Sequence, residues 1–193
     1  MLSGASSREE LNCIIGEMIG DLNSSHTYQG GGDLEKENTQ SVGYLGVDYE
    51  AEGNFYKIKK IIRGAPWDAE ARSPLEMPGV NIKEGNYLLA VNGEPLTTAQ
   101  EPFAFFQGLG DKTIELTYNS SPSFKGAKTV TVKAMKDEGR LRYLDWVETN
   151  RKRVDEETAG EVGYIYVPST GIDGQNERMR QFNAQWNKKA LII

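Results

Sequence analysis

The first apolar pattern in the chain has helical spacing. Ser7 stands three residues before Glu10, the arrangement of a capping box, in which two side chains bond free backbone N–H groups at a helix start. Apolar residues then recur every three or four positions, at Leu11, Ile14, Ile15, Met18, Ile19 and Leu22. This pattern predicts an amphipathic helix from Ser7 to Leu22 whose apolar stripe needs a partner surface, and it places Cys13 as a small core residue.

A polar stretch follows this helix and continues to about Gln40. It contains Gly30, Gly31 and Gly32, which lack the Lys and Ser/Thr of a phosphate-binding loop and are typical of a flexible linker. We therefore expect a domain boundary near residue 40.

From Val42 to Met135 the apolar residues form short runs and alternating patterns, which are typical of strands. The expected strands are Val42–Glu50, Phe55–Ile62, Tyr87–Val91, Ile114–Tyr118 and Val130–Ala134. The run Tyr87–Val91 is apolar almost throughout, so it is expected to be buried on both faces. These residues predict a small, mostly antiparallel sheet domain.

A turn and a short helix are expected inside this domain. Asn92 with Gly93 is a strong hairpin signal. Thr98 and Glu101 have the spacing of a second capping box, which predicts a short helix carrying Phe103 and Phe106 on its apolar side. Phe106 is expected in the core.

After Arg140 the helical period returns, and a strand, a helix and a second strand follow it. The strands are predicted at Val162–Val167 and Ala190–Ile193, and the helix between them carries Met179, Phe182 and Trp186 on one face. This order is typical of parallel strands. Because such a unit cannot bury its faces alone, we expect it to be the truncated start of a larger α/β domain.

Composition excludes several functional classes. The net charge of −6 and the pI near 5.0 oppose nucleic-acid binding, which needs clustered Lys and Arg. No stretch approaches the roughly 20 apolar residues that cross a bilayer, so no membrane partner is expected. With one His and one Cys the chain has no internal disulfide and no zinc site made of these ligands. We expect no metal and no cofactor.

Several segments of the predicted sheet domain resemble a known family. They are Pro66–Asp68, Glu70–Leu75, Pro78–Val80 and Lys83–Gly93, and they closely resemble the PDZ domain of tricorn-like proteases. On the N-terminal side, Glu17–Met18 and Asn23–Tyr28 resemble the end of that family's first catalytic segment. On the C-terminal side, Gly163–Pro168 and Lys189–Ile193 resemble the start of its second catalytic segment.

The resemblance implies an α+β fold with three parts. Residues 1–40 would be the end of the first catalytic segment, 41–137 the PDZ domain, and 138–193 the truncated start of the second catalytic segment. The PDZ domain would be a partly open antiparallel β-barrel with two helices. The N-terminal helix and a strand–helix–strand unit of an α/β peptidase core would flank it.

The same resemblance implies two catalytic residues. His26 would be the general base of a serine peptidase, because imidazole titrates near neutral pH, with an unperturbed pKa of about 6.5. Ser25 would orient the imidazole through its hydroxyl, the role that Asp has in the better-known triad. The family's serine nucleophile, oxyanion-hole glycines and catalytic glutamate would lie after Ile193. Without the resemblance, the better interpretation of His26 is an ordinary surface-loop histidine.

A peptide-binding loop is also implied. Its backbone N–H groups would bind the terminal carboxylate of a peptide that adds as an extra strand. The residues expected to form this site are Tyr44, Leu45, Gly46 and Val47 in the loop, with Val47 and Tyr49 lining one side of the groove and Phe103 the other. The alternative is a buried strand start that binds no ligand, since a PDZ fold does not guarantee one.

Two classes of function therefore remain open. The first is a fragment of a tricorn-like serine peptidase that hydrolyses peptides as the full chain and is inactive alone. The second is a peptide-binding or scaffold module without catalysis. The expected partners are peptides, the missing catalytic segments and further copies of the full-length protein. The expected location is cytoplasmic, with a periplasmic or exported protein as the alternative.

Overall fold

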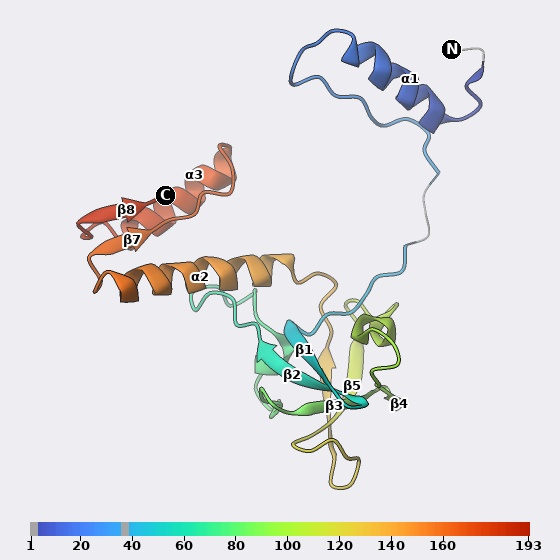
Figure 1. The fold of residues 1–193 in the computed structure, drawn as a ribbon, viewed down its shortest axis with the longest axis vertical. Helices are drawn as coiled ribbons and strands as arrows, with labels where there is room; N and C mark the ends of the chain where they lie inside the picture. Colours follow the sequence, from blue (N-terminus) through green and yellow to red (C-terminus); the bar gives the residue numbers. More distant parts are fainter. Residues whose placement is uncertain (1–3, 36–38) are drawn as a thin grey trace. The chain divides into compact units, whose positions relative to one another are not determined.

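The structure is a computed structural model that describes residues 4–35 and 39–193. The chain divides into two compact units, Met1–Thr39 and Gln40–Ile193. Figure 1 shows helix α1 in the first unit and all strands in the second. Within the described residues, no helix combines the length and the apolar character needed to cross a bilayer.

The first unit is built on helix α1, Arg8–Gly20. The predicted capping box is confirmed: Ser7 is the N-cap, its Oγ accepts from the Glu10 N–H at 3.2 Å, and the Glu10 side chain bonds back to the N-cap backbone. The following loop folds back on the helix, where the Gly31 carbonyl accepts from Arg8 Nε and Asn12 Nδ2, each at 3.2 Å. The glycine segment is thus held to the helix at Gly31.

The apolar stripe of α1 is only partly covered and is most open to solvent near its C-terminal end. Met18 is 63% and Leu22 66% exposed, and Asn12 is the buried residue of the helix. The expectation that Cys13 is a core residue is wrong, because its side chain is exposed. The loop contacts the helix on the side of Arg8 and Asn12, and Leu11, Ile14, Ile15 and Ile19 of the stripe are half-buried.

The second unit contains the predicted antiparallel sheet, in the order β1-β2-β3-β5-β6 with β4 paired to β3. Its strands are β1 Val47–Glu52, β2 Phe55–Ile61, β3 Tyr87–Val91, β4 Glu94–Pro95, β5 Thr113–Asn119 and β6 Lys128–Lys133. As predicted, every residue of β3 is buried. The β3–β4 turn has Asn92 and Gly93 at φ 51° and 82°, the left-handed pair that a tight hairpin requires.

The strand predicted from Val42 begins later, at Val47. Val42 and Tyr44 instead form single bridges, with Gln107 and Met135 respectively. Because Met135 follows β6, the bridge at Tyr44 joins the segment before β1 to the far edge of the sheet and partly closes it. Among the described strands, β1 keeps one edge without a neighbour.

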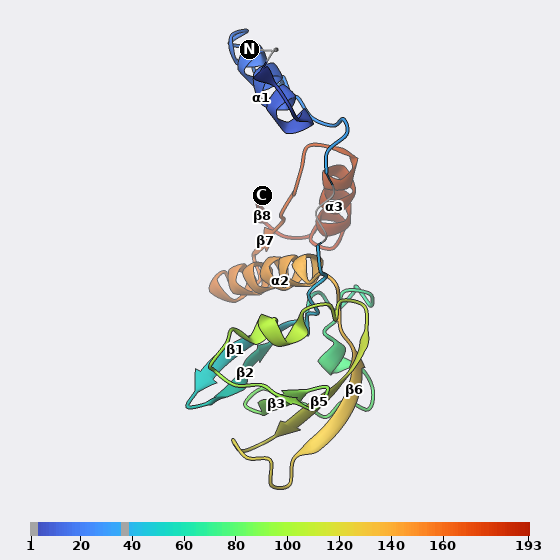
Figure 2. The same cartoon turned by 90° about the vertical axis from the view of Figure 1, so that its right-hand side faces the viewer.

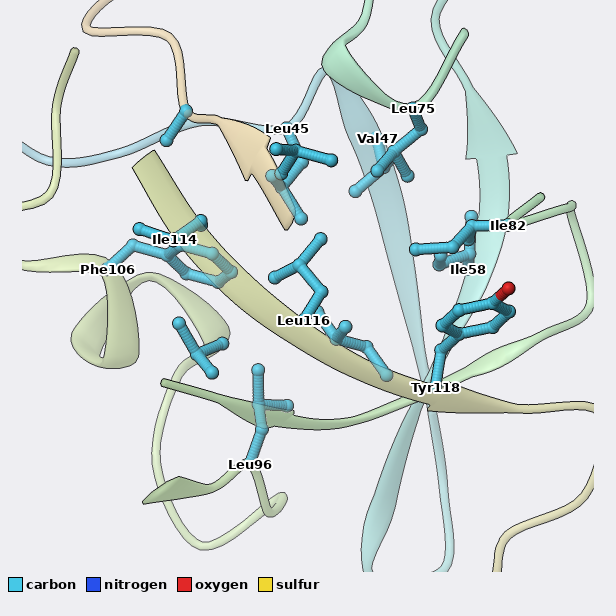
Figure 3. Close-up of a cluster of buried hydrophobic side chains, with 14 of the residues drawn as sticks. Leu45, Val47, Ile58, Leu75, Ile82, Leu96, Phe106, Ile114, Leu116 and Tyr118 are labelled. Atoms are coloured by element: carbon cyan, nitrogen blue, oxygen red, sulfur yellow. The ribbon is translucent and has the colours of Figure 1, made fainter. Parts of the chain in front are cut away.

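One apolar core lies inside this curved sheet, and Figure 3 shows its central side chains. Ile58, Leu88, Leu96, Phe106 and Leu116 are each 0% exposed. The sheet domain therefore buries its own apolar residues, and the placement of Phe106 in the core is confirmed.

The helical segments of the sheet domain are short 3-10 helices, η2 Pro74–Glu76 and η3 Pro102–Phe106. The second predicted capping box is wrong. Thr98 Oγ1 donates to the Gly53 carbonyl at 2.9 Å, and Glu101 precedes η3 without a capping bond. The Thr98 hydroxyl therefore bonds the β1–β2 turn, although its spacing from Glu101 predicted that it would cap the helix.

Helix α2, Gly139–Glu157, follows the sheet and packs on the loops of the sheet domain, where Leu141 meets Gly46 and Gly64 and buried Leu144 meets Ala65 and Ala71. Then come β7 Val162–Tyr164, α3 Ile172–Asn183 and β8 Ala190–Ile192. Strands β7 and β8 are parallel, as predicted. Figure 2 shows α2 between the sheet domain and this β7–α3–β8 segment.

The predicted strand at Val162–Val167 ends early, at Tyr164, and side-chain amides from α3 and from the turn after it bond the backbone at Tyr164 and Tyr166. Gln181 accepts from the Tyr166 N–H at 3.0 Å and donates to its carbonyl at 2.9 Å. Gln185 binds the Tyr164 backbone in the same way, with both distances 2.9 Å. Trp186 lies after the end of α3 and is 75% exposed, so it does not belong to the predicted helix face.

Candidate functional site

The loop after α1 presents His26 to solvent. His26 has φ 62°, in the left-handed region that few residues other than glycine adopt. Thr27 Oγ1 donates to the Ser24 carbonyl at 3.1 Å, and Ser24 Oγ donates to the Ser25 carbonyl at 3.4 Å. In the described part of this unit, no hydrogen bond joins the Ser25 hydroxyl to the His26 ring. The two residues are adjacent and exposed but unpaired with each other.

Residues Tyr44–Val47 are the predicted carboxylate-binding loop, which we call the carboxylate loop. The side chains of Leu45 and Val47 are each 2% exposed and belong to the apolar core. The expectation that Val47 lines a groove is therefore not met, because this side chain lies inside the closed sheet. The Ser73 hydroxyl donates to the Leu45 carbonyl at 2.7 Å and holds the loop in place.

Aromatic rings lie between the carboxylate loop and η3. The Phe103 ring centroid is 5.6 Å from that of Tyr44 and 6.0 Å from that of Tyr49, so these three predicted site residues are brought together. Phe103 remains 37% exposed. Burial raises the pKa of the Tyr49 phenol above its ordinary value, and the nearby Glu138 carboxylate raises it further. This hydroxyl therefore stays neutral.

The backbone groups of Tyr44 and Gly46 in the loop already have partners. Tyr44 donates to and accepts from the Met135 backbone at 2.8 and 2.9 Å. Gly46, at φ 66°, donates its N–H to Glu138 Oε2 at 3.1 Å. A carboxylate of the chain itself thus occupies an amide of the predicted anion site.

Arg142 extends this contact along β1. Its Nε donates to Glu138 Oε1 at 2.6 Å, one Nη donates to Asp48 Oδ1 at 2.7 Å, and the other donates to the Val47 carbonyl at 2.9 Å. Sequence reasoning missed both Glu138 and Arg142. Their spacing of four residues predicts an ion pair along one helix, but it does not predict that the pair contacts β1.

A second ion pair joins α2 to the sheet domain. Arg140 donates to Asp68 Oδ2 at 2.6 Å, and Asp68 Oδ1 accepts from the N–H groups of Glu70 and Ala71. The hydrogen bond from Arg140 lowers the pKa of Asp68 below its usual range. Burial acts in the opposite direction, and the two backbone hydrogen bonds lower the pKa further. Asp68 is therefore ionised at neutral pH.

No metal site accompanies these contacts. Across residues 4–35 and 39–193, His, Cys, Asp and Glu side chains form no group of three or more that could hold an ion. A cavity of about 680 Å³ lies beside α2, lined by side chains of both charges, and it contains none of the predicted site residues.

A partly closed antiparallel sheet, an edge strand and a glycine-containing loop in front of that strand together define a PDZ-type domain. Residues 43–137 match the family model described as "Tricorn protease PDZ domain". The predicted PDZ domain is thereby confirmed.

The similarity to tricorn proteases extends over the flanks. The chain is 33% identical over its whole length to a putative tricorn-like protease C-terminal subunit of Sulfurisphaera tokodaii, covering 22% of it. It is also 33% identical over its whole length to a tricorn protease homolog of Saccharolobus solfataricus, covering 18%. A crystal structure of the tricorn protease superposes on 97% of the chain with a TM-score of 0.85 and 25% identity, and the match covers 18% of that protein.

Residues 43–137 belong to the tricorn protease PDZ family, and the whole chain is similar to tricorn proteases. It spans about a fifth of the length of these relatives, 22% and 18% of the first two.

Proposed function

We propose that this chain is a segment of a serine peptidase of the tricorn type that hydrolyses peptides. One observation carries the proposal: the similarity to tricorn proteases continues on both sides of the PDZ domain and covers the whole chain. On this proposal residues 1–40 and 138–193 are the flanking catalytic segments, and 41–137 is the PDZ domain between them. The parallel strands β7 and β8 fit the edge of an α/β core.

His26 is the proposed general base. Its position in the exposed loop that follows α1 is typical of a group placed by a rigid scaffold. The imidazole would take the proton of a serine hydroxyl as that oxygen attacks the peptide carbonyl, and would return it to the leaving amine. Ser25 is proposed to orient the ring once the catalytic segments are assembled. The serine nucleophile is proposed to come from another catalytic segment of the full-length protein.

The test uses the full-length protein and a fluorogenic peptide. His26→Ala should lower kcat/KM by about 1000-fold or more, since the general base is lost. Ser25→Ala should lower it less, because only the orientation of the ring is lost. The control is Ser24→Ala, which should retain wild-type activity. Activity unaffected by His26→Ala would refute this role, whereas loss in the Ser24 variant alone would mean that the serine assignment is shifted by one residue.

Peptide binding at the PDZ domain is a second proposed function, and the free edge of β1 favours it. A peptide could add there as an extra strand, with Phe103 exposed on the neighbouring η3. Ordering one short strand costs entropy against few contacts, so a Kd of roughly micromolar or weaker is expected. Titration with a six-residue peptide should shift the amide resonances of β1 and leave those of β6 unchanged. Shifts absent from β1 would favour a scaffold role.

A further inference from the structure

The carboxylate loop is covered by the first turn of α2. The Leu141 side chain is 2% exposed and packs on Gly46: a Cβ built on Gly46 would lie 2.6 Å from Leu141 Cδ2. Gly64 meets the same side chain, with a built Cβ 2.9 Å from Leu141 Cδ1. Close approach of α2 thus depends on glycines at both positions.

Glu138 does not cap its own helix. It occupies the N-cap position of α2, yet its side chain makes no capping bond, and its Oε2 accepts the Gly46 N–H at 3.1 Å. The Gly139 N–H is bonded by Asp137 Oδ1 instead, at 2.7 Å. The Glu138 side chain is only 11% exposed, so the carboxylate is held in the loop and shielded from water.

Arg142 completes the pattern at the edge of β1. It donates to the Val47 carbonyl at 2.9 Å and holds Glu138 at 2.6 Å. The last residue of a bound peptide would offer a carboxylate to the loop amides, an apolar side chain beside them and N–H groups to the carbonyls of the edge strand. Glu138, Leu141 and Arg142 offer these same features.

We propose that Glu138, Leu141 and Arg142 form an internal ligand of the PDZ domain, which takes the place of a peptide's C-terminal residue. This proposal rests on the proposed peptide binding at β1. The internal ligand is already ordered by α2, so it gives up no translational freedom and acts at a high effective concentration. Glu138 therefore excludes free peptide carboxylates, and the unmodified protein does not distinguish a peptide acid from its C-terminal amide.

The experiment titrates the 193-residue chain with one six-residue peptide of hydrophobic C-terminus, as the free acid and as the amide, following backbone amide resonances. In the wild type both forms should bind with equal affinity, and the Gly46 resonance should not move. In Glu138→Ala the free acid should bind about tenfold or more tightly than in the wild type, because the loop amide and Arg142 become available to its charge. The amide should gain much less.

Glu138→Gln keeps the side-chain length and removes only the charge, so it decides the matter if the alanine variant does not fold. The matched control is Glu157→Ala. It removes another glutamate of α2 that pairs with an arginine four residues away, but Arg153 and Glu157 are 74% and 62% exposed and lie outside the proposed site. This variant should bind both peptides as the wild type does. A wild type that already prefers the acid, or a Glu138→Gln variant with unchanged affinities, overturns the internal ligand and leaves peptide binding standing. No binding by any variant overturns peptide binding at β1 and the internal ligand with it.

Discussion

The PDZ domain and the β7–α3–β8 segment differ in how their apolar side chains are buried. In the PDZ domain every residue of β3 is buried, and the sheet closes over one continuous core. In α3 the buried residues are Gly174 and Gln181, whereas Met179 is 49% and Phe182 41% exposed. The PDZ domain is held by apolar burial, whereas the side of the second segment that faces α3 is held by the side-chain amides of Gln181 and Gln185, which bond the backbone of Tyr166 and Tyr164.

This difference shows which part of the chain carries its own stability. Apolar burial contributes about 25 cal/mol for each Å² removed from water, while a hydrogen bond contributes a modest net amount because water also bonds the free groups. Helix α2 belongs with the PDZ domain, since Leu141 and Leu144 are each 2% exposed. The exposed face of α3 is available to a partner surface, as the proposed catalytic assembly requires.

The largest expected effect tests the two regions directly. Leu116→Ala removes a core side chain that is 0% exposed, and it should lower the free energy of unfolding by about 2–5 kcal/mol, because a cavity remains. The counterpart Met179→Ala, at a site 49% exposed, should change it by no more than about 0.5 kcal/mol. Urea unfolding measures both. Equal losses would mean that α3 belongs to the same cooperative core.

A smaller effect tests the packing of α2 on the PDZ domain. Gly46 and Gly53 have similar left-handed φ values, 66° and 60°, so alanine strains the backbone equally at both. Only Gly46→Ala also collides with Leu141, whereas a Cβ at Gly53 meets no atom within 4 Å. We expect Gly46→Ala to cost about 1–3 kcal/mol more than Gly53→Ala in thermal or urea unfolding. Equal costs would show that α2 yields easily at this contact.

The smallest effect concerns the ion pair of Asp68 and Arg140. Asp68 is buried but Arg140 is 69% exposed, so Asp68→Asn should cost about 1–2 kcal/mol at pH 7. Because the folded pKa of Asp68 is lowered, its stabilisation is present above the unfolded pKa of about 3.9 and is lost as the pH falls through the folded value.

Unfolding measured from pH 7 to pH 2 should therefore show a shallower loss of stability for Asp68→Asn than for the wild type below pH 4. The control is Glu156→Gln, at an exposed pair with Lys152, which should leave the pH profile unchanged. Identical profiles for Asp68→Asn and the wild type would mean that this carboxylate does not link α2 to the PDZ domain.

Local patterns in the sequence determined much of the fold. The apolar run Tyr87–Val91, the hairpin at Asn92–Gly93 and the capping box at Ser7 each depend on neighbouring residues, and the structure confirms all three. The parallel pairing of β7 with β8 followed from element order. Such features are predictable because their hydrogen bonds and periodicity are set within a few residues.

Only the tertiary structure decided how the candidate peptide site is occupied. The Gly46–Glu138 contact joins residues 92 apart, and the Arg142–Asp48 contact joins residues 94 apart. No local preference encodes such contacts, because they depend on where the packing of Leu141 places α2. Competition for a polar group is likewise a tertiary matter: the Thr98 hydroxyl bonds Gly53 instead of capping η3, since the folded sheet brings that carbonyl within reach.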